Sequence, residues 1–122
     1  MNNEDSNIYG TNEKNDAGPG PQLMGADTLI GNDVYNRAEE DLGDIKEIML
    51  DMESGKIVYA VLSYGGVLGI GEKLFAVPWG ALTLDTENKR FILNVEKDKL
   101  ENAPGFDKDN WPDVADSSWT NI

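Results

Sequence analysis

The sequence contains no cysteine and no histidine, and these two absences exclude several kinds of chemistry. Without thiols there is no disulfide framework, which agrees with an expected cytoplasmic location. Zinc sites built from thiolate or imidazole are excluded, as are Cys–His and Ser–His–Asp catalysis. A metal ion could be held only by oxygen ligands, as calcium and magnesium are. No residue pattern in the chain predicts a cofactor.

Long apolar runs and basic segments are also missing. No apolar run approaches the roughly 18–20 residues that a transmembrane helix needs. The first residues, MNNEDSNIYG, have no basic start and no apolar stretch behind it, so no secretory signal is predicted. The formal net charge is −13, which would repel a phosphate backbone or an anionic membrane. The sequence therefore predicts a cytoplasmic protein without nucleic-acid binding or membrane insertion.

Three segments differ in composition. Residues 1–26 are rich in Asn, Gly and Pro and lack hydrophobic periodicity, which is typical of a disordered tail. Residues 27–105 carry short apolar runs with turn residues every ~8–12 positions, the spacing of a small all-β barrel or sandwich. Residues 106–122 hold two of the three tryptophans among aspartates, and aromatic residues at that density rarely stay in water. This extension is expected to pack on the barrel or on another chain.

Six strands and one short helix are expected in the middle of the chain. The helix is Glu96–Asn102, with Leu100 as its buried anchor, and Pro104 stops it. The expected strands are Asp33–Asn36, Gly43–Asp51, Lys56–Ser63, Glu72–Trp79, Leu82–Asp85 and Arg90–Val95.

The alternation of apolar residues adds detail to the second and third strands. Ile45 has the opposite parity from Ile48 and Leu50, which predicts a β-bulge in the second strand. In the third strand, residues 57, 59 and 61 are expected on one face and residues 58, 60 and 62 on the other. A strand that is apolar on both faces must be covered on both sides. The barrel interior covers one side, and the tail, a helix or a second subunit is expected on the other.

The glycine-rich stretch 63–74 contains two glycines at the spacing of a phosphate-binding loop, Gly66 and Gly71. Such a loop needs a lysine directly after the second glycine and a helix to follow, whereas Glu72 and a strand follow here. Nucleotide binding is therefore not predicted. Leu68 and Ile70 on this loop are expected either to form a docking patch or to cover the open end of the barrel.

Two aromatic segments are further candidates for binding. Trp79 follows a proline that marks a strand end, and it is expected either to close the core or to face a partner. Residues 107–113 begin like a calcium loop but lack its fifth-position ligand and its glycine, so no metal site is predicted. Phe106 and Trp111 are expected to anchor this segment while its aspartates face water. No pair of carboxylates is recognisable as a catalytic pair.

Several blocks of the sequence resemble, in order, the PRC-barrel domain family. The resemblance covers about residues 27–105, and residues 106–119 are similar to the tail of some stand-alone bacterial members. It implies a small six-stranded β-barrel, no known catalytic residues and a role as an interaction module that often self-associates. The blocks are LIGNDVY at 29–35, LGDIKEIMLD at 42–51, VYAVLS at 58–63, GGVLGIGEK at 65–73 and AVPW at 76–79.

Known members of that family set the range of activities that the resemblance implies. One lies at the cytoplasmic side of the purple-bacterial photosynthetic reaction centre, and another forms half of a ribosome-maturation factor. The sequence shows neither the membrane helix of the first nor the RNA-processing partner domain of the second. Only the class of activity, binding to other macromolecules, is therefore expected to carry over.

The sequence as a whole predicts a non-catalytic protein–protein interaction module, expected to be a homodimer, with an unknown protein partner. The alternative is a barrel that binds a small ligand or a hard cation such as calcium or magnesium. An enzyme comes third and would require two buried carboxylates facing each other in a pocket. The residues expected to make contacts are Leu68, Ile70, Trp79, Phe106, Trp111 and Trp119.

Overall fold

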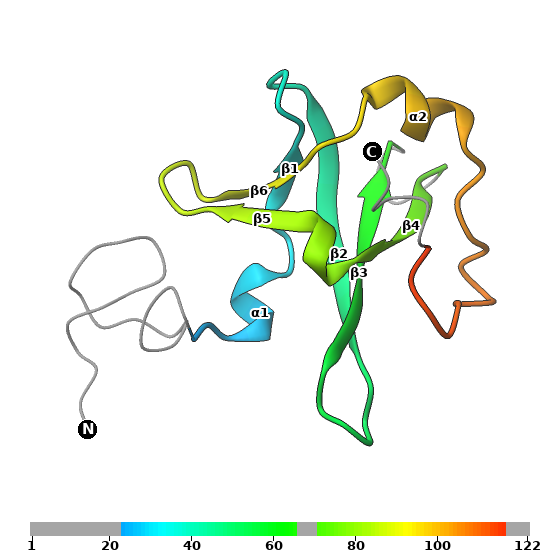
Figure 1. Cartoon of the computed structure of the whole chain (residues 1–122). Coiled ribbons are helices and arrows are strands. Elements are labelled where there is room, and N and C mark those ends of the chain that lie inside the picture. Colours follow the sequence, from blue (N-terminus) through cyan, green and yellow to red (C-terminus); the bar gives the residue numbers. More distant parts are fainter. Residues whose placement is uncertain (1–22, 66–70, 117–122) are drawn as a thin grey trace.

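The computed structural model describes residues 23–65 and 71–116. Among these residues, six strands form one sheet in the order β4-β3-β2-β1-β6-β5. Figure 1 shows the sheet curling, so that the β5–β6 pair crosses the long β2–β3 pair. The predicted all-β class is confirmed, and each strand end lies within two residues of its predicted position. The strands are β1 (Asp33–Tyr35), β2 (Asp41–Leu50), β3 (Ile57–Tyr64), β4 (Lys73–Pro78), β5 (Leu82–Asp85) and β6 (Arg90–Leu93).

The connections between strands explain the curl. Within the described sheet, β1 and β6 are parallel and the other neighbours are antiparallel. The two ends of the sheet are β4 and β5, and the 3-10 turn Trp79–Ala81 joins them directly. Pro78 ends β4 because it has no N–H for the ladder. Helix α1 (Ala26–Leu29) precedes the sheet, and helix α2 (Lys97–Asn102) follows it.

The predicted bulge in the second strand is confirmed. The register between β2 and β3 shifts between Ile45 and Glu47, which moves the later residues of β2 to the opposite parity. The two strands also approach closely at Gly43, which has φ 122. A Cβ atom there would lie 2.0 Å from the Ser63 carbonyl oxygen, so only glycine fits this position.

The inner face of the curled sheet forms the main core. Every strand contributes to it, and the two helices add Leu29 and Leu100 from opposite ends of the chain. Phe91, Leu93 and Val95 point inward together, as the alternation of the last strand indicates. The buried members of this inner core are Leu29, Val34, Leu42, Ile45, Ile48, Ala60, Leu62, Tyr64, Phe75, Val77, Phe91, Leu93, Val95 and Leu100.

Strand β3 is covered on both faces, as its sequence requires. Residues 60, 62 and 64 face the inner core, while Tyr59 and Val61 belong to a second, outer cluster. The predicted parity is wrong for the first two residues, because Ile57 packs against the inner core and Val58 against the outer cluster. The reason is a register shift between Met49 and Leu50 on β2, which leaves Val58 as an extra residue.

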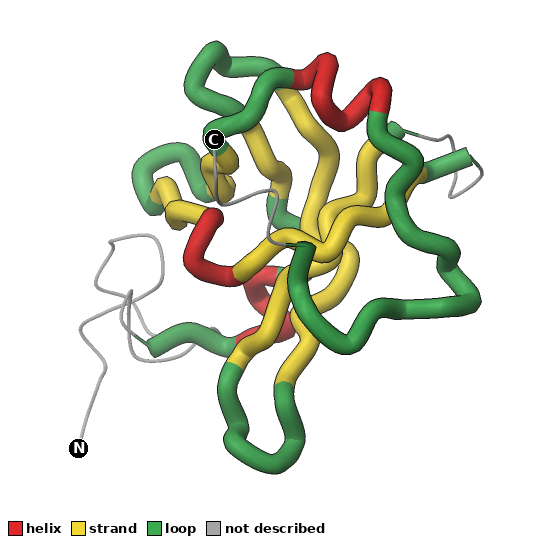
Figure 2. The backbone as a smooth tube through the Cα atoms, turned by 45° about the vertical axis from the view of Figure 1, so that its right-hand side comes forward, coloured by secondary structure: helices red, strands yellow, loops and turns green. Residues whose placement is uncertain are grey.

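The chain's own C-terminal segment, residues 103–116, covers the outer face of β3 and β4. In Figure 2 the loop after α2 runs down one side of the sheet and returns across it. The outer cluster consists of buried Tyr59, Val61, Leu74 and Ala76, with Phe106, Trp111 and Ala115 packed against them. Among the described residues, the cover of this face is the C-terminal segment of the same chain.

Candidate functional site

The C-terminal segment is held to the sheet first through helix α2. The Lys73 Nζ atom, at the start of β4, donates hydrogen bonds to the carbonyl oxygens of Glu101 at 2.6 Å, Ala103 at 3.0 Å and Leu100 at 3.3 Å. These carbonyls belong to the last turn of α2 and to its C-cap residue, Ala103, where the helix itself supplies no donors. The lysine therefore caps the helix and fixes the direction in which residue 103 leaves it.

A second contact holds the same helix. The Tyr64 hydroxyl donates a hydrogen bond to the Glu101 carboxylate. This bond, followed by burial of the ring, raises the pKa of Tyr64 to about 12. Tyr64, the last residue of β3, and Lys73, the first residue of β4, thus both form hydrogen bonds with Glu101 in the last turn of α2.

The segment then meets the free edge of β4 twice. The Phe106 N–H donates to the Leu74 carbonyl oxygen at 2.7 Å, and the Asp116 N–H donates to the Ala76 carbonyl oxygen at 3.0 Å. Gly105 permits the first contact, because it has φ 73 and a Cβ atom there would lie 2.8 Å from the Leu74 oxygen. The edge is thereby partly occupied, which protects it from pairing with other chains.

Between these two contacts the segment folds over its own aromatic residues. The Phe106 and Trp111 rings meet edge to face, with centroids 5.3 Å apart. The Trp111 indole N–H donates to the Lys108 carbonyl oxygen at 2.7 Å. From the sheet below, the Tyr59 hydroxyl donates to the Pro112 carbonyl oxygen at 2.8 Å. The prediction that Phe106 and Trp111 anchor this segment is confirmed.

An apolar hollow remains where the segment arches away from β4. Its volume is about 400 Å³, within the ~300–1,000 Å³ typical of binding pockets. It opens to solvent at Val114, which is 68% exposed. Apart from Lys99, Gly105 and Asp116, the lining is apolar. The apolar lining residues are Leu74, Phe75, Ala76, Ala103, Pro104, Phe106, Pro112, Val114 and Ala115.

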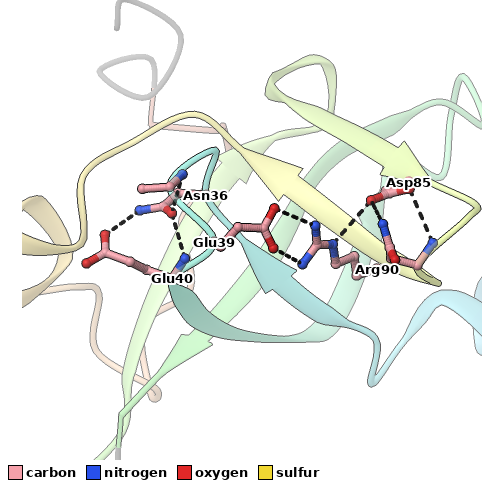
Figure 3. A network of polar contacts seen from close by, with 7 residues as sticks. Asn36, Glu39, Glu40, Asp85 and Arg90 are labelled. Atoms are coloured by element: carbon pink, nitrogen blue, oxygen red, sulfur yellow. Dashed lines mark hydrogen bonds and ion pairs between the residues drawn. The ribbon is translucent and has the colours of Figure 1, made fainter.

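A polar network lies elsewhere, on the β1–β6–β5 side of the sheet (Figure 3). The Arg90 guanidinium donates two hydrogen bonds of 2.9 Å to the Glu39 carboxylate and one of 3.2 Å to Asp85. It also lies 4.6 Å from the centroid of the Tyr35 ring. Hydrogen bonding to Arg90 lowers the pKa of Glu39, and bonding to Asn88 and then Arg90 lowers the pKa of Asp85. The network therefore has a structural role, because it links the β1–β2 turn to the β5–β6 hairpin.

The six residues predicted as contacts lie in different places. Phe106 and Trp111 lie together beside the hollow, and Phe106 lines it. Trp79 lies in the 3-10 turn after β4, half-buried against the inner core, with its ring centroid 5.9 Å from that of Phe91. The remaining three predicted residues, Leu68, Ile70 and Trp119, lie outside the described residues.

Sequence reasoning missed the hollow itself. Val114 and Ala115 carry no periodic signal, and their apolar neighbours Ala103 and Pro104 precede the aromatic segment in the chain. The one available signal was a short apolar pair between two tryptophans in the otherwise acidic C-terminal extension.

Within residues 23–65 and 71–116, no three acidic side chains gather as a metal-binding group. The helices of this part of the chain are too short to cross a membrane.

Comparisons with known proteins place the chain in a family. The family model described as the PRC-barrel domain matches residues 21–100. A comparison with curated proteins gives no match. Among solved structures, one similar chain is described as a 16S ribosomal RNA processing protein, RimM, from Pseudomonas aeruginosa. It is 16% identical, with a TM-score of 0.40, over 60% of this chain and 44% of that one. The chain thus spans less than half the length of that protein.

Proposed function

Because this chain belongs to the PRC-barrel domain family, we propose that it is a non-catalytic protein-interaction module. The apolar hollow beside β4 is its binding surface. The single observation that carries this proposal is an open apolar hollow of about 400 Å³. Interaction sites combine such hollows with buried aromatic or aliphatic anchors supplied by the partner. The partner is therefore a protein segment that presents an apolar or aromatic side chain.

The charge of the molecule favours a protein partner over a nucleic acid. The net charge is −13, and phosphate backbones are bound by clusters of Lys and Arg. The hollow has one lysine and one aspartate among its lining residues, Lys99 and Asp116. This lining favours neither an anionic nor a cationic ligand. It favours burial of an apolar group.

Several carboxylates of the described residues are engaged in structural contacts. Hydrogen bonds from Lys46 and Ser63 lower the pKa of Glu72, just as partners lower those of Glu39 and Asp85. These groups are held ionised by structural contacts. Burial, followed by repulsion from Asp33, raises the pKa of Asp44, but this carboxylate lies on β2, away from the hollow.

Self-association and a cytoplasmic location stay predictions. The sequence arguments for a homodimer were the two apolar faces of β3, the aromatic C-terminal extension, the absence of a recognisable catalytic set and the family resemblance. Phe106 and Trp111 of the same chain cover the outer face of β3, which weakens the first of these arguments. For such a homodimer, the hollow beside β4 is the contact surface that we propose. Sedimentation equilibrium tests this, and a monomer at high protein concentration would contradict the homodimer.

The proposal is tested by placing a charge at the mouth of the hollow. Val114→Asp changes an exposed rim residue, and Leu23→Asp is the matched control because Leu23 is 64% exposed and does not line the hollow. The wild type and both variants are used to capture proteins from an extract of the source organism. We expect V114D to lose about tenfold or more of the bound partner and L23D to keep it, since loss of one buried anchor costs roughly 2 kcal/mol.

Two results would count against the proposal. If V114D and L23D capture the same proteins as the wild type, the hollow is not the binding surface. If the hollow instead binds small apolar metabolites, detected as ligand signals that V114D abolishes, the module is a small-ligand barrel.

A further inference from the structure

The end of the β2–β3 hairpin projects from the sheet. β2 and β3 pair as far as Leu50 and Ile57. In contrast, β4 reaches only Tyr59 on β3, and β1 reaches only residues 41–44 of β2. Residues 50–57 therefore have no neighbouring strand in the described sheet, and Figures 1 and 2 show this end of the hairpin extending beyond the other strands.

This projecting tip, residues 50–57, carries apolar side chains that nothing in the described part of the chain covers. Met52 is 88% exposed and Leu50 is 47% exposed. A methionine side chain is flexible and fills irregular apolar gaps, and methionine is enriched where proteins contact one another. Met52 is therefore suited to enter an apolar hollow on another molecule.

The hollow beside β4 can receive such a side chain, but Met52 of the same chain lies too far from it. Ala76 lines the hollow and pairs with Val61 on β3. At ~3.3 Å per residue, the β3 backbone from Val61 back to Ile57 spans about 13 Å and leads away from the hollow toward the tip. The tip and the hollow can therefore meet only between two molecules.

The charges on the two surfaces are compatible with this contact. Glu53 and Lys56 on the tip are exposed, while the Asp51 carboxylate accepts hydrogen bonds within the turn. The lining of the hollow has one lysine and one aspartate, Lys99 and Asp116. Both surfaces thus carry charges of both signs around an apolar centre, which permits opposite charges to face each other at the rim.

We propose that Met52 of one copy of this chain inserts into the hollow of a second copy. This inference rests on the proposed function, because it uses the same hollow, and it names a second copy as the partner. Two copies related by a two-fold axis form the contact twice, since each copy presents both a tip and a hollow. Each copy has a net charge of −13, so we expect added salt to favour the contact by screening the repulsion.

The test uses two variants that each lack one half of the contact. Met52→Asp places a charge on the tip and leaves the hollow intact. Val114→Asp places a charge at the mouth of the hollow and leaves the tip intact. Both residues are exposed, so both variants should fold as the wild type does. Leu23→Asp, at a third exposed apolar position, is the matched control.

Sedimentation equilibrium measures the association of each protein alone and of an equimolar mixture of M52D and V114D. We expect the wild type and L23D to dimerise, and each of M52D and V114D alone to dimerise at least tenfold more weakly. The mixture should associate more strongly than either variant alone, because the tip of V114D still fits the hollow of M52D. When only M52D carries ¹⁵N, adding V114D should shift its Leu74 and Phe106 amide signals.

The outcomes separate the two proposals. The inference is overturned by a wild type that stays monomeric at high protein and salt concentration, by M52D dimerising as the wild type does, or by a mixture that associates no better than the separate variants. If one of these results is found but V114D still loses its captured partner, the hollow binds another protein and the proposed function stands. If V114D both dimerises and captures normally, the proposed function fails as well.

Discussion

The charged form of the Asp44 carboxylate is disfavoured in the folded protein. It lies on β2 directly opposite Asp33 on β1. Burial raises its pKa first, and repulsion from Asp33, Glu72 and Asp41 raises it further. A raised pKa in the folded state means that the charged form destabilises folding. This penalty is present at neutral pH and disappears as the pH falls through the raised pKa to the ordinary aspartate value.

We expect Asp44→Asn to stabilise the protein at neutral pH by about 0.5 kcal/mol, since like charges on paired strands cost amounts of this order. The gain over the wild type should vanish below the ordinary aspartate pKa, where both side chains are neutral. Urea unfolding at several pH values measures the difference. Glu87→Gln, which neutralises an exposed carboxylate on the β5–β6 turn, should show no such gain. A constant difference at all pH values would contradict the electrostatic explanation.

Gly105 is the residue that lets the C-terminal segment touch β4. Gly105 and Gly55 have similar positive φ angles, 73 and 77, but only Gly105 has backbone within reach of an added Cβ atom. Gly105→Ala and Gly55→Ala therefore impose similar backbone strain. We expect G105A to cost about 1 kcal/mol more in unfolding free energy, because it adds a steric clash to that strain.

Hydrogen exchange of backbone amides tests which contacts G105A weakens. In G105A the amides of Phe106 and Asp116 should exchange faster, because both donate to the edge of β4. In G55A they should be unchanged. Equal losses of stability in the two variants would mean that the contact at β4 contributes nothing beyond the turn.

At the scale of elements, the link between the β3–β4 pair and α2 sets the path of everything that follows. The Lys73 ammonium donates to two carbonyls of a six-residue helix, those of Leu100 and Glu101, and to the carbonyl of its C-cap residue, Ala103. A helix this short has little stability of its own. Its position therefore depends on tertiary contacts.

We expect Lys73→Met to lower the unfolding free energy by about 1.5 kcal/mol, since hydrogen bonds from charged donors contribute ~1.5–3 kcal/mol. Lys46→Met is the matched control, because the Lys46 ion pair with Glu72 is on the surface and such pairs contribute ~0–1 kcal/mol. Chemical denaturation gives both values. The role assigned to Lys73 would be wrong if K46M were the more damaging variant.

The hydrogen bond between Tyr64 and Glu101 makes the same link sensitive to alkaline pH. Because the pKa of Tyr64 is raised to about 12 in the folded protein, the protonated hydroxyl stabilises the fold. This contribution is complete below the ordinary tyrosine pKa of about 10 and is lost as the pH rises through the folded value. We expect the wild type to lose more stability over this range than Tyr64→Phe, measured by denaturation at each pH. Parallel curves would contradict the assignment.

At the scale of the whole molecule, both faces of the sheet are apolar, and segments of the same chain cover both of them. The inner face closes on itself through the curl, and the outer face of β3 and β4 depends on residues 103–116. A small domain buries a limited fraction of its surface. Losing this cover would expose both an apolar patch and a free strand edge, the two features that drive association.

We expect removal of residues 106–122 to convert the protein into large soluble oligomers or aggregates, because Tyr59, Val61, Leu74 and Ala76 lose their cover. Sedimentation velocity measures the size distribution. Removal of residues 117–122 alone is the control, and it should leave the distribution of the wild type, because Phe106 and Trp111 remain. A truncated chain that sediments like the wild type would show that the outer cluster needs no cover.

The sequence by itself determined the strands and their faces. Alternation is a local property of extended backbone, so Phe91, Leu93 and Val95 could be placed inward from their spacing alone. The shift of parity after Ile45 likewise revealed the bulge. Resemblance to a known family then predicted the barrel, and the match of the family model to residues 21–100 confirms the family. The local rule failed at Val58, where pairing with β2 introduced a second irregularity.

Only the tertiary structure decided which part of the chain covers the outer face, and hence where the hollow that we propose as a binding surface remains. The hollow is bounded by β4 and by residues 103–116, and no local pattern fixes the distance between them. That distance follows from Lys73 capping α2 and from Gly105 allowing the approach to Leu74. Contacts between residues some thirty positions apart depend on how the whole chain closes, which periodicity along a single strand cannot encode.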